Sequence, residues 1–110
     1  MSSSFLIVDE DRNFREALAI ALRLEGCRVA SADSAAGGLA ALAADRFDLC
    51  VVDLHLAGAE AFLAGVLEGR QPVLLTGPHA DLLRLAARRF PRAQVLEKPF
   101  QVGELLRLAA

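Results

Sequence analysis

The sequence predicts a doubly wound α/β fold, in which helices cover both faces of a five-stranded parallel sheet. Short apolar runs alternate strictly with segments of helical periodicity along the 110 residues, and such alternation is typical of a parallel sheet. The strand-like runs are nearly continuously apolar, as expected for strands that are buried on both sides. No repeat, linker or low-complexity stretch interrupts this order, so residues 1-110 are expected to form a single domain.

The first strand and helix precede Gly26. Residues 4–9 are apolar and β-prone and then become acidic, which predicts a strand. From Asp11, a suitable N-cap, the apolar spacing becomes helical, and Gly26 is placed to end the helix. The residues on its expected apolar stripe are Phe14, Leu18, Ala21, Leu22 and Leu24.

The second strand and helix are less regular. Residues 27–31 predict a short strand, and Ser34 is placed to cap a helix that runs to about Asp45. Gly37 and Gly38 lower the helical propensity of this segment. The residues expected to face inward are Leu39, Leu42 and Ala43.

Three further strand–helix pairs complete the pattern. The expected strands are residues 48–53, 73–76 and 93–97, and the expected helices are residues 59–68, 79–89 and 101–109. Prolines separate several of these elements, because proline disrupts both helices and sheets. The apolar positions of the third and fourth helices are Phe62, Leu63, Val66 and Leu67, then Leu82, Leu83, Leu85 and Ala86.

Composition and charge argue against several classes of protein. The net charge of −2 provides no basic surface for nucleic acid. No apolar stretch is long enough to span a membrane, and the first residues lack the basic and apolar regions of a signal peptide. Cys27 and Cys50 lie in or beside expected strands and are predicted to be reduced core residues, which favours a cytoplasmic location.

Charged side chains follow three of the expected strands. Asp9 and Glu10 end the first strand, Asp53 ends the third, and Lys98 follows the fifth. In an open parallel sheet, the carboxyl ends of the strands meet at one edge, where ligands bind. Carboxylates gathered in one cleft repel each other unless a cation joins them. This arrangement favours a divalent metal and phosphoryl chemistry.

Short motifs at four strand ends carry a resemblance that covers essentially the whole chain. They are Val8-Asp9-Glu10-Asp11, Val52-Asp53-Leu54, Leu75-Thr76-Gly77 and Glu97-Lys98-Pro99-Phe100. With the four motifs in this order, the chain resembles the receiver domain of two-component response regulators. The resemblance implies the flavodoxin-like strand order 2-1-3-4-5 and a signalling module rather than a turnover enzyme.

The resemblance assigns the acidic residues to phosphate and metal. Asp53 would be the phosphoacceptor, taking a phosphoryl group from a histidine kinase or a phosphotransfer protein. Asp9, Glu10, Asp53 and the backbone carbonyl of His55 would hold Mg²⁺, a hard cation that takes oxygen ligands. These roles suit the chemistry, because a carboxylate can form an aspartyl phosphate and because phosphoryl transfer depends on positioning and charge neutralisation.

The resemblance also implies a switch. Lys98 would pair with the phosphoryl oxygens, Thr76 would donate its hydroxyl to one of them, and Gly77 would leave room for the group. The Lys98-Pro99 bond is cis in the family. The face formed by residues 79–109 would then change and contact a second copy or an output domain.

Three positions depart from the family pattern. Val95 stands where an aromatic residue often couples to the threonine, and Ala57 stands where proline is common; the usual glycine of that loop is displaced, with Gly58 the nearest. The stretch from Asp53 to Thr76 is also short, which predicts a trimmed or shifted third helix. These departures motivate an alternative, a pseudo-receiver that acts as a phosphorylation-independent interaction module.

His55 argues against two other classes. Haloacid-dehalogenase-like phosphohydrolases place a second aspartate two residues after the nucleophile, whereas this chain has His55 there. No second histidine or cysteine stands at zinc-ligand spacing from His55, which disfavours a zinc site.

Overall fold

The computed structural model describes residues 3–109, so the expected domain limits at residues 1 and 110 lie outside the described part. The strands are β1 (Ser4–Val8), β2 (Arg28–Ala32), β3 (Leu49–Asp53), β4 (Val73–Gly77) and β5 (Gln94–Glu97). The helices are α1 (Arg12–Leu24), α2 (Ala35–Ala44), α3 (Ala59–Glu68), α4 (Ala80–Arg89) and α5 (Val102–Ala109). All strand pairs are parallel, and their order is β2-β1-β3-β4-β5, which confirms the expected topology.

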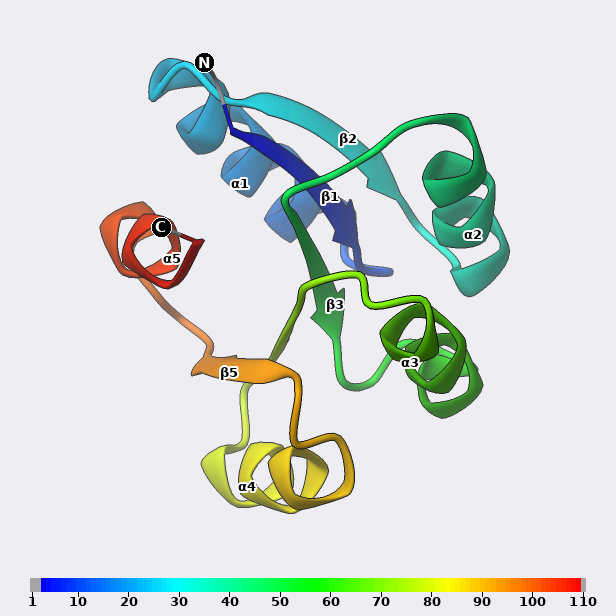
Figure 1. Cartoon of the computed structure of the whole chain (residues 1–110). Helices are drawn as coiled ribbons and strands as arrows, with labels where there is room; N and C mark the ends of the chain where they lie inside the picture. The colour runs from blue at the N-terminus through cyan, green and yellow to red at the C-terminus, as the bar shows by residue number, and fades with distance from the viewer. Residues whose placement is uncertain (1–2, 110) are drawn as a thin grey trace.

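The sheet separates two hydrophobic clusters. Figure 1 shows α1 and α5 on one side of the sheet and α2 and α3 on the other. Within β1, Phe5 and Ile7 belong to the cluster under α1 and α5, and Leu6 and Val8 belong to the cluster under α2, α3 and α4. All four side chains are fully buried. The continuous apolar strands therefore have the burial that a doubly wound sheet requires.

The expected helix caps are confirmed. Asp11 Oδ1 accepts the backbone N–H of Phe14 at 3.2 Å, and Ser34 Oγ accepts that of Gly37 at 3.1 Å. Gly26 follows α1 with a φ of +84°, a left-handed conformation that glycine adopts without strain. Local capping chemistry thus sets the starts of α1 and α2 and the end of α1.

The inward face of α2 differs from the expected one. Of the three residues expected to face inward, Leu42 packs against the core, whereas Leu39 is 50% exposed and Ala43 is exposed. Gly38 is the buried residue of the helix. A Cβ atom at Gly38 would lie 3.0 Å from the Phe62 ring and 3.1 Å from Val8 Cγ2. Gly38 therefore lets α2 approach the sheet and α3 closely. The glycine that weakens the helical pattern is the residue on which the packing of α2 depends.

In α1 and α4, only some of the residues on the expected apolar stripe are buried. In α1, Leu24 is 81% exposed, and Ala19 is buried although it was not expected to be. In α4, Leu83 and Ala86 are buried, but the other two apolar residues expected to face inward, Leu82 and Leu85, are exposed. Helical periodicity predicts a face only approximately, because neighbouring elements determine how much of it is covered.

The third helix lies where the apolar pattern predicted it. It covers the expected residues 59–68, and its four expected apolar side chains, Phe62, Leu63, Val66 and Leu67, are buried. Cys27 and Cys50 are free, and Cys50 is buried in the core as expected. No helix within residues 3–109 has the length and apolar character needed to cross a membrane.

Candidate functional site

The parallel strands bring the predicted site residues to one edge of the sheet. Asp9 directly follows β1, Asp53 ends β3, Thr76 lies near the end of β4, and Lys98 directly follows β5. Asp53 and Thr76 are register partners, and the backbone N–H of Lys98 bonds to the carbonyl of Gly77 at 2.8 Å. Segments that are far apart in sequence therefore form one cleft, as the strand order predicts.

Lys98 joins two of the carboxylates. Its Nζ lies 2.7 Å from Asp9 Oδ2 and 3.1 Å from Asp53 Oδ1. Asp9 is 2% exposed and Asp53 is 8% exposed. One ammonium offsets only one of the two carboxylate charges, so the cleft retains a negative charge in a largely buried place. That charge favours a second cation.

The same contacts affect the ionisation of Lys98. Burial lowers the pKa of Lys98, but the hydrogen bonds and charges of Asp9 and then Asp53 more than offset it, so that the pKa lies above its ordinary value. Lys98 therefore carries its positive charge at neutral pH. The ammonium can therefore donate hydrogen bonds to anions but cannot accept a proton.

Backbone N–H groups hold the other oxygen of each carboxylate. Asp9 Oδ1 accepts from the N–H of Asp11 at 2.9 Å, and Asp53 Oδ2 accepts from that of His55 at 3.1 Å. In addition, Arg15 Nη1 donates to the backbone carbonyl of Asp9 at 2.7 Å, a contact that the sequence did not indicate. Both carboxylates are therefore oriented from two sides, which leaves them pre-organised for a ligand.

Thr76 is a buried polar residue whose hydroxyl has no partner. The residue is fully buried, and among residues 3–109 no group forms a hydrogen bond with Thr76 Oγ1. Buried polar atoms are nearly always paired, so an unpaired one needs a reason. The free donor of this hydroxyl, on the strand beside Asp53, suits an oxygen atom of a ligand bound at this edge of the sheet.

Glu10 is not in contact with the Lys98 ammonium. Glu10 Oε1 accepts the backbone N–H of Ala57 at 2.9 Å, in the loop between β3 and α3. Among the described residues, no three Asp, Glu, His or Cys side chains are grouped so as to hold a metal. Mg²⁺ typically takes one or two carboxylates and keeps several waters. The oxygen atoms of Asp9 and Asp53 fit that requirement, and Glu10 is engaged elsewhere.

The fold brings together two histidines that the sequence did not connect. The rings of His55 and His79 pack edge to face with centroids 5.8 Å apart. They come from the loops after β3 and β4, which adjoin the site. No third metal-ligating side chain joins them within residues 3–109, so this pair adds nothing to the case for zinc.

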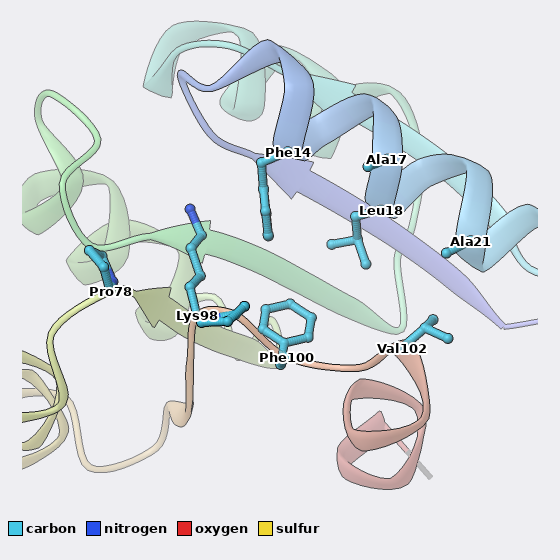
Figure 2. A pocket seen from close by; sticks show the side chains of 9 residues that line it. Phe14, Ala17, Leu18, Ala21, Pro78, Lys98, Phe100 and Val102 are labelled. Carbon is cyan, nitrogen blue, oxygen red and sulfur yellow. The ribbon is translucent and has the colours of Figure 1, made fainter.

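Phe14 also reaches the site, although the sequence indicated only an apolar helix position. Lys98 Nζ lies 3.9 Å from the centroid of the Phe14 ring. Both residues line a pocket of about 460 Å³ between α1 and the segment that joins β5 to α5. Figure 2 shows the Phe14 side chain projecting from α1 toward Lys98 and Phe100. The Lys98-Pro99 bond that follows β5 is cis, as the resemblance implied.

Comparison with known proteins identifies the family. Residues 5–110 match the response regulator receiver domain, and the chain belongs to this family. It is 35% identical to the response regulator protein FleR of Pseudomonas aeruginosa over all of its length. A response regulator receiver protein of Anaeromyxobacter sp. is 37% identical over 94% of the chain. The protein is therefore a signal-transduction domain of two-component systems rather than a conventional enzyme.

Solved structures agree with the fold. The chemotaxis response regulator CheY4 of Vibrio cholerae superposes with a TM-score of 0.85 at 19% identity, over all of both chains. NtrX of Brucella abortus superposes with a TM-score of 0.86 at 26% identity, over 99% of this chain and 26% of that protein. This chain spans 24% of the length of FleR and 46% of the Anaeromyxobacter protein.

Proposed function

We propose that Asp53 accepts a phosphoryl group from a phosphohistidine of a histidine kinase or a phosphotransfer protein. The observation that carries this proposal is the juxtaposition of a lysine-bridged pair of buried carboxylates with an unpaired buried hydroxyl. The pair provides a nucleophile with an adjacent cation, and Thr76 Oγ1 provides a donor without a partner. A cytoplasmic location is part of the same proposal.

The chemistry follows from these groups. A carboxylate oxygen of Asp53 attacks phosphorus, the phosphorus–nitrogen bond of the donor breaks, and its electron pair returns to the imidazole ring. Lys98 then exchanges its bond to Asp53 Oδ1 for a phosphoryl oxygen, and Thr76 donates to another. Asp9, Asp53 and the His55 carbonyl would hold Mg²⁺, and Glu10 would join them once its bond to Ala57 opens. The ion would supply charge neutralisation at the phosphoryl oxygens.

The same exchange would operate a switch. A hydrogen bond to a charged group contributes about 1.5–3 kcal/mol, so two such bonds can shift a two-state equilibrium more than tenfold. The responding face would be residues 79–109, where Leu82 and Leu85 of α4 are already exposed. An output domain or a second copy of the chain would cover that face. Val95 packs against the core at the position where an aromatic residue would couple to Thr76.

A phosphodonor assay tests this function. The protein is incubated with Mg²⁺ and acetyl phosphate, and its mass is measured. We expect the mass of one phosphoryl group to be gained by the wild type and by Asp45→Ala, and not by Asp53→Ala. Asp45 is a matched control because it is exposed and precedes β3, at the end of that strand opposite Asp53. An unmodified wild type at saturating Mg²⁺ would contradict the proposal.

A pseudo-receiver is the second candidate, and one observation favours it. The hydrogen bond from Ala57 to Glu10 removes one carboxylate from the metal-binding side of the cleft. In that case the wild type and Asp53→Ala would bind the partner protein with equal affinity, because binding would not depend on phosphorylation. The acetyl phosphate assay separates the two functions, because a pseudo-receiver gains no mass. Rapid multiple turnover would instead indicate a phosphohydrolase.

A further inference from the structure

Four residues form a closed ring of contacts on the α1 side of the site. Asp9 Oδ1 accepts the N–H of Asp11 at 2.9 Å, and Asp11 Oδ1 accepts the N–H of Phe14 at 3.2 Å. The Phe14 ring lies under Lys98 Nζ at 3.9 Å, and Nζ returns to Asp9 Oδ2 at 2.7 Å. The hydrogen bonds that cap α1 are therefore connected, through Asp9 and Phe14, to the side chain of Lys98.

Phe100, which is not one of these four residues, packs against the Phe14 side chain and orients its aromatic ring. Phe100 packs edge to face against Phe14, with centroids 5.9 Å apart and an angle of 78° between the ring planes. In Figure 2, Lys98 and Phe100 approach Phe14 from the same loop. The negative face of an aromatic ring attracts a cation, and the attraction increases as water is excluded. The Lys98 side chain is only 18% exposed.

We propose that Phe14 is a positioning residue for Lys98. Its ring holds the ammonium at the edge of the sheet, so that Lys98 exchanges Asp53 Oδ1 for a phosphoryl oxygen without leaving the cleft. The inference rests on the proposed function, because it concerns how Lys98 is presented to the phosphoryl group. It goes beyond a packing role, since an aliphatic side chain would fill the same space without attracting the ammonium.

Three variants distinguish positioning from packing. Phe14→Leu keeps an apolar side chain and removes the ring, whereas Phe14→Tyr keeps the ring. Phe47→Leu is the matched control, because Phe47 is a half-buried ring that precedes β3, at the end of the sheet away from Asp53. Urea unfolding of all three variants measures how much each change affects the fold itself.

Two measurements report on Lys98. In the free protein, NMR should show the Lys98 methylene protons displaced upfield by the ring current of Phe14. This displacement should vanish in Phe14→Leu and persist in Phe14→Tyr and Phe47→Leu. With Mg²⁺ present, titration with beryllofluoride should show binding roughly 5- to 30-fold weaker in Phe14→Leu. Affinity in Phe14→Tyr and Phe47→Leu should stay near that of the wild type.

The outcomes separate this inference from the proposed function. Equal beryllofluoride affinity in Phe14→Leu and the wild type overturns the inference alone, as does an equal loss in Phe14→Leu and Phe47→Leu. Absence of the upfield displacement in the wild type also overturns it. If the wild type does not bind beryllofluoride in the presence of Mg²⁺, the proposed function is overturned, and the inference, which rests on it, is overturned as well.

Discussion

Asp53 and Thr76 are register partners in the neighbouring parallel strands β3 and β4, yet their side chains differ in how well they are paired. Asp53 accepts hydrogen bonds from Lys98 and from the backbone of His55. Thr76 Oγ1 is buried and has no partner among the described residues. A buried unpaired hydroxyl costs about 1–3 kcal/mol. Under the proposed phosphorylation, a phosphoryl oxygen on Asp53 would accept a hydrogen bond from this hydroxyl and remove that cost.

Thr76→Val should affect stability and ligand binding in opposite directions. Valine has nearly the shape of threonine and no hydroxyl, so we expect the free energy of unfolding to rise by about 1 kcal/mol. Beryllofluoride binding with Mg²⁺ should weaken roughly tenfold, because one charge-assisted hydrogen bond is lost. Urea unfolding measures the change in stability, and titration with beryllofluoride in the presence of Mg²⁺ measures the change in binding. Thr76→Ser serves as the control and should bind like the wild type; a less stable Thr76→Val protein would contradict this account.

Lys98→Met should weaken the fold and strengthen metal binding. Without the ammonium, the buried carboxylates of Asp9 and Asp53 lose the cation between them, so we expect the free energy of unfolding to fall by about 3 kcal/mol. Mg²⁺ would then no longer compete with the ammonium for the two carboxylates, and its affinity should rise about tenfold. Calorimetry with MgCl₂ and urea unfolding with and without Mg²⁺ measure these effects. Unchanged or weaker Mg²⁺ binding in Lys98→Met would contradict competition between the ammonium and the metal.

Ala57→Pro should release Glu10. Proline has no backbone N–H, so the bond that holds Glu10 Oε1 to the loop cannot form. The freed carboxylate should raise Mg²⁺ affinity about three- to tenfold, because affinity increases with the charge of the ligand set. Calorimetry measures this gain. Adding Glu10→Gln to Ala57→Pro is the control and should abolish the gain; an unchanged affinity in Ala57→Pro would exclude Glu10 from the metal site.

Two glycine-to-alanine substitutions should have opposite effects. At Gly38, a new Cβ would lie 3.0 Å from the Phe62 ring, so we expect a loss of about 1–3 kcal/mol despite the better helix propensity of alanine. At Gly65 in α3, a Cβ meets nothing within 4 Å, and we expect a gain of about 0.5–1 kcal/mol. Urea unfolding compares the two variants. A stabilised Gly38→Ala protein would contradict the close packing of α2.

Stability should decrease in alkaline solution. Burial raises the pKa of Cys50 to about 12, and burial followed by the charge of Glu25 raises the pKa of Cys27. Burial lowers the pKa of Lys98, but Asp9 and Asp53 more than offset this, so that the pKa is raised. The folded state keeps protons that the unfolded state loses, so stability is full below the ordinary thiol pKa of 9.0 and falls as pH rises toward 12. Urea unfolding at pH 8 and pH 11 should show this decrease, and Cys50→Ala should make it smaller.

The two thiols should react at different rates. At pH 8, a disulfide reagent should modify Cys27, which is partly exposed, whereas Cys50 should react only after unfolding. The absorbance released by the reagent counts the thiols, with Cys27→Ser as the control. Rapid reaction of both thiols in the folded protein would contradict the burial of Cys50.

The strands of the sheet and the polar residues at their carboxyl ends could be predicted from the sequence alone. Apolar runs placed the strands, and parallel order brought Asp9, Asp53, Thr76 and Lys98 to the same ends of those strands. Capping residues predicted helix ends, because the hydrogen bonds of a cap join residues that are close in sequence. These features depend on short stretches of chain and on the geometry of a parallel sheet, so one sequence was enough to predict them.

Contacts between side chains of distant elements could not be predicted from the sequence. The buried face of α2 depends on Gly38, because Phe62 and Val8 lie against it, and periodicity contains no such information. Glu10 bonds to Ala57, and Phe14 lies under Lys98, through loops whose paths no motif specifies. The carboxyl ends of strands are fixed by backbone pairing, whereas these contacts depend on side-chain packing between distant elements. The meeting of Asp53 and Lys98 at one sheet edge could therefore be predicted from the sequence, but the contact of the Phe14 ring with Lys98 could not.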